Sequence, residues 1–470
     1  MKENDVAVNA AIAALRPMFG SRLSTASAVC EQHGKDPTWH KAMPPDAVVF
    51  AETAAEVQAV MRVCHAQGVP VIPYGVGTSV EGHISAPRGG VTLNLSGMNR
   101  ILNINAADLD VTVEPGVTRE ALNEQLRHTG LFFPIDPGAN ATLGGMAATR
   151  ASGTNAVRYG TMASNVLALD VVLPDGTLIH TGTRARKSAA GYDLTRLFVG
   201  SEGTLGVITA LTLRLHGIPP CISAAVSAFS SLEGAVLTTM DTIQAGIPIA
   251  RIELLDDVQV NAVNRHSQLN LPVRHTLFLE FHGSKAGVEE QVQEVRALAE
   301  AHGGEDFRWA SRQEERNQLW QARHQALFAA KGLRPGCEVF VADVCVPISR
   351  LAECILQTRR DIDAESLTAP IVGHVGDGNF HVLFLLDPAN AVEVARVEAV
   401  NHRMVERALA MGGTCTGEHG IGLGKKTCLR QEAGAAVDLM ATIKAAVDPK
   451  GIMNPGKLFD AAAHHRATEP

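Results

Sequence analysis

Short apolar runs alternate with amphipathic segments through the first half of the chain, from Ala47 onward. The apolar runs are brief and bounded by Gly, Pro, Asn or Asp, which is typical of strands. They lie at 48–50, 69–73, 91–95, 111–113, 168–173 and 206–215. Helices are predicted between them, over 57–67 after a capping box at Thr53 and before Gly68, and over 118–128. This alternation predicts α/β organisation.

The pattern changes near Cys221, after a turn-rich stretch at 217–220. In the second half, the predicted strands and helices alternate at longer intervals. The strands lie at 222–229, 249–254 and 275–281, and the helices at 233–244, 287–302, 313–330 and 392–411. This order predicts an antiparallel sheet with helices on one face.

The two patterns divide the chain into four parts. We expect a polar helical lead-in at 1–41, a first domain at 42–219, a second domain at 220–440 and a C-terminal segment at 441–470. A length of 470 residues agrees with two or three domains. The predicted fold class is α+β, with α/β organisation in the first domain and an antiparallel sheet covered by helices in the second.

Two histidines flank a polar turn in the second domain. His374 and His381 stand in GHVGDGNFH, between apolar runs at 370–375 and 380–386, so a hairpin is predicted. If Val375 faces Phe380, the two histidines face each other, with Cβ atoms about 5 Å apart on one side of the sheet. Imidazole pairs of this kind bind divalent ions such as Zn or Mn. A half-buried aromatic pair is the alternative.

A Glu-His pair follows the 392–411 helix, in TGEHGIG. Glu418 is the candidate third metal ligand, and His419 is then a candidate base beside the ion. The surrounding glycines favour close approach of the backbone to a ligand, although such a loop can also be an ordinary turn. Cys415 is an alternative soft ligand, but a buried cysteine is more often an apolar filler.

Composition and charge exclude several classes of protein. A net charge of -8 argues against a nucleic-acid partner. The eight cysteines form no C-x-x-C pair, which favours free thiols in a reducing compartment. No apolar run is long enough to span a membrane, and the N-terminus has no signal-peptide pattern. We therefore expect a cytoplasmic location, with peripheral membrane association left open.

Three glycine-rich loops follow apolar runs in the first domain. They are PYGVGTSVEG at 73–82, DPGANATLGG at 136–145, which continues to Gly160, and GSEGTLGVI at 200–208. Consecutive main-chain N–H groups in such loops can hold a phosphate. None is a dinucleotide-binding fingerprint or a P-loop. Three loops together favour a large, extended, phosphate-bearing cofactor over a mononucleotide.

These segments carry a family resemblance. The chain resembles the FAD-dependent D-2-hydroxyacid dehydrogenases of the vanillyl-alcohol oxidase/PCMH superfamily, in the branch of cytochrome-type D-lactate dehydrogenases and glycolate oxidase catalytic subunits. The likeness runs from about Ala47 to Phe459 and rests on the three loops and on DVCVP, GHVGDGNFH, TGEHGIGLGK and MNPGK. It implies a PCMH-type FAD-binding domain of two α/β subdomains, a cap domain that binds substrate, and a C-terminal segment that returns to the flavin.

The resemblance also implies the FAD contacts. The first loop would hold the pyrophosphate, the second the flavin and ribityl chain, and the third the adenine side. The residues are Pro73, Gly75, Gly77, Thr78, Ser79, Gly82, Pro137, Gly138, Thr142, Gly144, Gly145, Ser152, Gly153, Gly160, Glu202, Gly206, Ile208 and Asn454. Some flavoproteins of the superfamily attach FAD through a histidine at the position of Thr78, so non-covalent FAD is expected here.

The same resemblance assigns the metal ligands to His374, His381 and Glu418, the base to His419, and the substrate-carboxylate arginine to Arg323. Guanidinium matches a carboxylate in shape and charge. Relatives that act on 2-hydroxyglutarate usually carry Thr and Lys where this chain has Leu327 and Val341. A short monocarboxylate such as D-lactate is therefore the expected substrate, with hydride transfer to the flavin N5.

Several alternatives remain at this point. Glycolate oxidation as one subunit of a complex, a flavin-free metal-binding protein, and a non-redox flavin ether synthase of the same fold are the rival functions. The metal is expected to be Zn or Mn, with Fe also compatible. Cytochrome c, a quinone or a flavoprotein partner can each be the electron acceptor. The sequence does not decide the oligomeric state.

Overall fold

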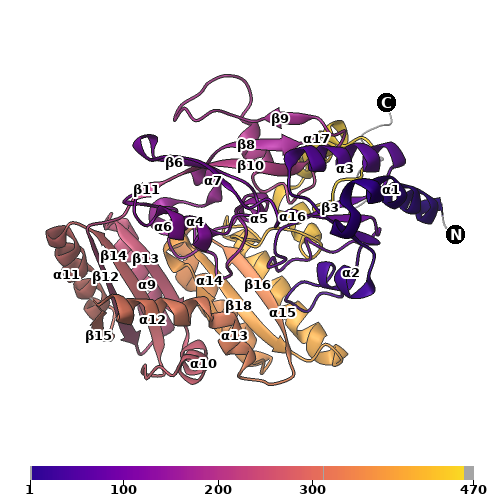
Figure 1. The fold of residues 1–470 in the computed structure, drawn as a ribbon. Coiled ribbons are helices and arrows are strands. Elements are labelled where there is room, and N and C mark those ends of the chain that lie inside the picture. Colours follow the sequence, from indigo (N-terminus) through magenta and orange to yellow (C-terminus); the bar gives the residue numbers. More distant parts are fainter. Residues whose placement is uncertain (1–2, 311, 460–470) are drawn as a thin grey trace.

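The computed structural model describes residues 3–310 and 312–459. Figure 1 shows the N-terminal half, indigo to magenta, lying against a large sheet coloured pink to orange. The first sheet has the order β1-β2-β4-β3, with β2 and β3 parallel to β4 and β1 antiparallel to β2. Its strands are β1 (Leu23–Ser24), β2 (Ala47–Phe50), β3 (Val71–Tyr74) and β4 (Val91–Asn94).

Three helices accompany the first sheet, namely α1 (Glu3–Phe19), α2 (Ser27–His33) and α3 (Ala54–Gln67). The predicted helix after Thr53 is confirmed, because the Thr53 side chain accepts a hydrogen bond from Glu56 N and Gly68 ends the helix with φ 68°. The apolar side of α1 is buried in the same core as α3. The N-terminal segment is therefore part of this core and not only a polar lead-in.

The second sheet is antiparallel, in the order β5-β6-β10-β8-β9. Its strands are β5 (Ile101–Asn105), β6 (Asp110–Val113), β8 (Val166–Val172), β9 (Leu178–His180) and β10 (Val207–Arg214). Helices α4 (Arg119–Leu126), α5 (Leu143–Thr149), α6 (Ala156–Tyr159), α7 (Met162–Asn165) and α8 (Leu194–Phe198) accompany it, with a small pair of β7 (Leu131–Phe132) and β11 (His216–Gly217). The second glycine-rich loop, residues 136–160, contains α5.

The second half forms a seven-stranded antiparallel sheet, as predicted, in the order β15-β12-β14-β13-β17-β18-β16. Its strands are β12 (Cys221–Phe229), β13 (Ile249–Leu255), β14 (His275–Gly283), β15 (Gly304–Ala310), β16 (Glu338–Cys345), β17 (Ile371–Gly373) and β18 (Asn379–Leu386). Its central strands carry apolar side chains toward both faces, because both faces are buried.

Helices cover both faces of this sheet, so the prediction of helices on one face was wrong. One face packs against α9 (Leu232–Gln244), α11 (Lys285–Ala301), α14 (Leu351–Ala364) and α15 (Ala391–Ala410). The other packs against α10 (Asp257–Ser267), α12 (Gln313–His324) and α13 (Ala326–Lys331). The single helix predicted over 313–330 is broken at Gln325, whose backbone leaves the helical region (φ -87°, ψ 11°).

The predicted hairpin forms, but with another register. Val372 pairs with His381, two residues away from the expected pairing, because residues 375–377 form a turn of 3-10 helix. A shift of two residues keeps each side chain on its predicted face. The rings of His374 and His381 therefore still meet, with centroids 5.3 Å apart.

The C-terminal part returns to the first sheet after α16 (Lys426–Ala433) and α17 (Ala436–Val447). Met453 pairs with Val71 in β3, and Asn454 N donates to Val71 O at 2.8 Å. This contact places Asn454 beside the start of the first glycine-rich loop. The rest of the predicted segment, 460–470, lies outside the described residues.

Candidate active site

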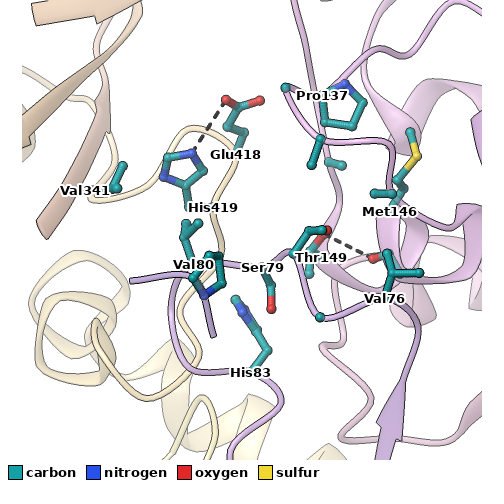
Figure 2. Close-up of a pocket in the computed structure, with 18 of the residues that line it drawn as sticks. Val76, Ser79, Val80, His83, Pro137, Met146, Thr149, Val341, Glu418 and His419 are labelled. Carbon is teal, nitrogen blue, oxygen red and sulfur yellow. Dashed lines mark hydrogen bonds and ion pairs between the residues drawn. The ribbon is translucent and has the colours of Figure 1, made fainter. Parts of the chain in front are cut away.

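A cavity of about 360 Å³ lies between the N-terminal half and the seven-stranded sheet. Figure 2 shows Ser79 and Val80 from the first loop, Pro137 and Met146 from the second, and the adjacent Glu418 and His419 facing this space. The glycine-rich loops and the histidine site, which are far apart in the sequence, thus border one cavity.

The structure brings the three predicted metal ligands together. Nε2 of His374 lies 3.1 Å from Oε1 of Glu418, and Nε2 of His381 lies 3.2 Å from the same oxygen. The three ligand atoms all lie within 4.8 Å of one another, and the site is largely buried. Two imidazole nitrogens and a carboxylate leave open positions on a bound ion, which is typical of catalytic sites.

Each ligand histidine is backed by a second carboxylate. Nδ1 of His374 lies 2.8 Å from Oε1 of Glu253, and Nδ1 of His381 lies 3.2 Å from Oδ1 of Asp343. Metal-ligating histidines usually hold their other ring nitrogen in this way, which fixes ring orientation and raises basicity. The residues present therefore fit a divalent ion. Sequence analysis missed Glu253 and Asp343, although each is an acid inside an apolar strand.

Asp343 also orders the loop that carries Glu418 and His419. Its Oδ2 accepts hydrogen bonds from the Thr416 hydroxyl at 2.8 Å and from the Gly417 amide at 2.8 Å. Burial alone would raise the pKa of this carboxyl, but nearby His419 and Lys425 hold it well below its usual range. Asp343 is therefore a fixed negative charge behind the site.

His419 lies beside the candidate metal ligands and stacks on His381, with ring centroids 4.8 Å apart. Its Nε2 lies 3.7 Å from Glu418 Oε1, and its Nδ1 lies 3.8 Å from Asp343 Oδ2 (Figure 2). Burial lowers the pKa of His419 to about 4. The imidazole is then neutral near neutral pH and can accept a proton.

Arg323 reaches the cavity from the end of α12 and is buried. Its Nε donates a hydrogen bond to Oε2 of Glu253 at 2.8 Å, and its Nη2 lies 2.6 Å from the same oxygen. Nη1 therefore remains for another partner. Arg323, Glu253 and His374 thus form one chain of contacts that ends at the candidate metal ligands. Among the described residues, Cys415, the alternative soft ligand, is buried and belongs neither to the His374, His381 and Glu418 cluster nor to the second possible metal group, Asp343, His381 and His419.

Most of the cofactor residues implied by the resemblance line the cavity. They are Pro73, Gly75, Gly77, Thr78, Ser79, Pro137, Gly138, Thr142, Gly145, Glu202 and Asn454. The main-chain N–H groups of 76–80 donate to no other described residue, so they are available to phosphate oxygens. A Cβ on Gly77 would lie within 2.9 Å of Tyr74 Cζ, so this turn needs glycine. These features fit an extended phosphate-bearing cofactor.

Seven of the implied cofactor residues do not line the cavity, and their FAD contacts stay a prediction. They are Gly82, Gly144, Ser152, Gly153, Gly160, Gly206 and Ile208. Packing explains several of them. A Cβ on Gly144 would lie 2.5 Å from Pro115 Cβ, a Cβ on Gly206 would lie 2.7 Å from Val171 Cγ1, and Ile208 belongs to the core of the second sheet.

An apolar wall borders the cavity near the histidines. Val372 and Leu383 come from β17 and β18, Val341 from β16, and Leu327 from α13. Val341 and Leu383 are paired across the sheet. These side chains offer no charged partner, so a second carboxylate on a ligand would be left unpaired here.

A cavity lined by glycine-rich loops, with a His-His-Glu cluster and a neutral histidine at one end, is the arrangement of a flavin-dependent oxidoreductase. Comparison with known families agrees. A model described as "FAD binding domain" matches residues 45–182, and one described as "FAD linked oxidases, C-terminal domain" matches residues 218–458. The chain therefore binds FAD in its first domain.

Curated relatives define the group more closely. The chain is 54% identical to a probable mitochondrial D-lactate dehydrogenase of Danio rerio, over 97% of this chain and 92% of that protein. It is 48% identical to a mitochondrial D-lactate dehydrogenase (cytochrome) of Arabidopsis thaliana, over 91% and 76%. A glycolate oxidase subunit of Bacillus subtilis is 34% identical, over 90% of both chains. The chain belongs to the FAD-linked oxidase family that contains the D-lactate dehydrogenases.

Solved structures share the fold. A p-cresol methylhydroxylase with substrate bound superposes with a TM-score of 0.79 at 20% identity, covering 96% of this chain and 97% of that one. An alkyldihydroxyacetonephosphate synthase superposes with a TM-score of 0.73 at 19% identity, covering 95% and 84%. The predicted PCMH-type architecture is therefore confirmed.

Proposed function

We propose that this chain is a metal-dependent FAD dehydrogenase that oxidises D-lactate, and related short D-2-hydroxy acids, to the 2-oxo acid. One observation carries the proposal. His374, His381 and Glu418 converge at one end of the cavity, each histidine is backed by a carboxylate, and the neutral His419 lies next to them. Two relatives at 54% and 48% identity are named D-lactate dehydrogenases, which supports the choice of substrate.

Each residue has a distinct role in the proposed reaction. His374, His381 and Glu418 would hold a Zn, Mn or Fe ion. FAD, when bound, supplies the two-electron acceptor, and the ion supplies Lewis acidity. Nε2 of His419 accepts the proton of the substrate hydroxyl. Its Nδ1 faces Asp343 at 3.8 Å, and this negative charge stabilises the imidazolium that forms.

Substrate orientation comes from a cation and an apolar surface. Nη1 of Arg323, which does not contact Glu253, would bind the substrate carboxylate. Leu327, Val341 and Leu383 would contact the short alkyl group. This arrangement favours a monocarboxylate over 2-hydroxyglutarate. Glycolate, which lacks the methyl group, is the second candidate because a relative named glycolate oxidase subunit is 34% identical.

The electron acceptor and location are proposed from the relatives. The names of the Arabidopsis and Saccharomyces proteins include cytochrome, which favours a cytochrome over a quinone or a flavoprotein partner. The same names describe those two proteins as mitochondrial. Within residues 3–310 and 312–459, no helix has the length and hydropathy needed to cross a membrane. The cytoplasmic location stays a prediction.

The experiment is a substrate panel with an artificial dye as acceptor. D-lactate, L-lactate, glycolate, D-2-hydroxybutyrate and D-2-hydroxyglutarate are compared by kcat/KM, with and without prior chelation and with metal added back. We expect D-lactate to be preferred, L-lactate to be inactive, and activity to follow the metal. Faster turnover of glycolate would favour the second candidate, and full activity in a metal-free preparation would overturn the metal-dependent mechanism.

A further inference from the structure

The loop that carries Glu418 and His419 is held from both domains. On one side, Asp343 of the seven-stranded sheet accepts hydrogen bonds from the start of the loop, at Thr416 and Gly417. On the other side, Glu202 and Glu81 of the FAD-binding domain accept hydrogen bonds from amides that follow His419, Glu202 through its carboxylate and Glu81 through its main-chain carbonyl. The position of the metal loop therefore depends on the FAD-binding domain as well as on the sheet.

Glu202 makes the closest of these contacts. Its Oε1 accepts a hydrogen bond from Ile421 N at 2.7 Å, and its Oε2 accepts one from Gly422 N at 2.8 Å. Glu202 is 5% exposed. Its main chain is anchored as well, because Asn454 Nδ2 donates to Glu202 O at 2.7 Å. Each carboxylate oxygen thus accepts one hydrogen bond from the loop, and Oε2 also lies 3.2 Å from Nε2 of His83.

The loop approaches Glu202 so closely that glycine is required. A Cβ on Gly420, where φ is +80°, would lie 2.7 Å from Glu202 Oε1 and 2.9 Å from His83 Nε2. Glu81 adds a second attachment, because its carbonyl accepts from Leu423 N at 2.8 Å and its carboxylate lies 3.1 Å from Lys425 Nζ. Two acids of the FAD-binding domain thus hold residues 420–425.

We propose that Glu202 is a positioning residue of the metal site, which sets Glu418 and His419 through the amides of Ile421 and Gly422. This inference rests on the proposed metal-dependent function. It differs from the role that the family resemblance implies, in which Glu202 contacts the adenine side of FAD. Both oxygens accept hydrogen bonds from the loop, and this geometry favours a role in positioning the loop over a contact with adenine.

The test measures metal and flavin separately in the holoenzyme. Glu202→Gln replaces one of the two acceptors by an amide NH₂ group, and we expect metal affinity to fall by about tenfold, the lower end of the effect of partners that contact a ligand directly. We expect the zinc dissociation constant, from competition with a chromophoric chelator, to rise by about that factor while the ratio of FAD to protein stays at the wild-type value. Cobalt substitution should also give an altered ligand-field spectrum.

Glu114→Gln is the matched control. Glu114 is also buried in the FAD-binding domain and accepts hydrogen bonds, but its partner is Arg100 and not the metal loop. The Glu114→Gln variant should therefore leave zinc affinity unchanged. If Glu202→Gln does not fold, Glu202→Asp retains the charge but is one methylene shorter, and it should show a smaller loss of zinc affinity.

The outcomes separate the inference from the function on which it rests. Wild-type protein that binds no divalent ion would overturn the proposed function. Wild-type zinc affinity in the Glu202 variants, with FAD retained, would overturn only the positioning role. Loss of FAD with zinc affinity retained would indicate that Glu202 contacts the cofactor instead.

Discussion

Nδ1 of His374 lies 2.8 Å from Oε1 of Glu253, while Nε2 of the same ring lies 3.1 Å from Oε1 of Glu418. The ring is therefore held between a candidate metal ligand and a buried acid. The second oxygen of Glu253 pairs with Arg323 at 2.6 Å. One carboxylate thus connects the group proposed to bind the ion with the group proposed to bind the substrate.

Glu253→Gln should weaken metal binding without removing a ligand. The neutral amide supports the His374 ring less strongly, and loss of such a partner typically lowers metal affinity by about 10–100-fold. Chelator competition measures the effect. Glu280→Gln, which changes a buried acid of the neighbouring strand β14 outside the cluster, is the control. Equal metal affinity in the two variants would contradict the proposed role of Glu253.

His381→Ala should abolish turnover of D-lactate while FAD stays bound. The imidazole is a proposed metal ligand, and it is not part of the glycine-rich loops that line the rest of the cavity. Dye-coupled activity and the flavin absorption of the purified variant are the two measurements. His402→Ala, on the exposed side of α15, should change neither. Loss of flavin in the His381 variant would indicate a structural role instead.

Arg323→Lys should raise KM for D-lactate and lower kcat/KM by about 10–150-fold. The factor corresponds to about 1.5–3 kcal/mol for a hydrogen bond to a charged group. Lysine keeps the charge but cannot contact Glu253 and a substrate carboxylate through one planar fork. Steady-state kinetics measure the change, with the exposed Arg308→Lys as control. An unchanged KM would place the substrate carboxylate elsewhere.

Local patterns predicted many of the elements of this fold but not β16, α10 or α14, and side-chain periodicity predicted which face of the hairpin carries the histidines. The register was wrong by two residues, because the turn at 375–377 forms a 3-10 helix that the sequence does not specify. The face was right since a two-residue shift preserves it. Likewise, the break at Gln325 divides a helix whose apolar pattern continues across it.

Contacts between distant segments were the part that sequence could not supply. Glu253 precedes His374 by 121 positions, and Glu202 precedes Gly422 by 220. Nothing in either local sequence specifies the partner, since a buried acid in a strand or loop is explained only by what it contacts in space. The resemblance named the ligands and the glycine-rich loops, but it gave no partners for the ligands and assigned Glu202 to the cofactor.

Val341→Ala should widen the cavity where the substrate alkyl group is proposed to lie. Val341 lines the cavity and pairs with Leu383 across the sheet. One methylene in an apolar pocket changes discrimination by about 1–3 kcal/mol. We therefore expect the ratio of kcat/KM for D-2-hydroxybutyrate to that for D-lactate to rise by about tenfold. A fall in both values with no change in their ratio would exclude Val341 from the substrate contact.

A buried acid joins the second glycine-rich loop to the seven-stranded sheet. Asp136 accepts hydrogen bonds from the Thr154 hydroxyl at 2.6 Å and from Asn155 N at 3.0 Å. Its Oδ2 also lies 3.2 Å from Arg251 Nη2 and 3.5 Å from His324 Nε2. Burial alone would raise the pKa of Asp136, but Arg251 and His324 bring it below the ordinary value of 3.8.

The stability supplied by Asp136 should therefore depend on pH. A carboxyl whose pKa is lower in the folded than in the unfolded state stabilises the fold above its unfolded pKa, and the contribution is lost as the pH falls below that value. Asp136→Asn should cost about 3–5 kcal/mol near neutral pH, because Arg251 loses a buried partner. The cost should shrink below about pH 4, because the carboxyl of the unfolded wild-type chain then gains a proton while the folded one keeps its charge. Urea unfolding of the FAD-bound protein at neutral and acidic pH measures both values, with the exposed Asp306→Asn as control. A cost that is the same at both pH values would show that geometry, and not charge, stabilises this contact between the domains.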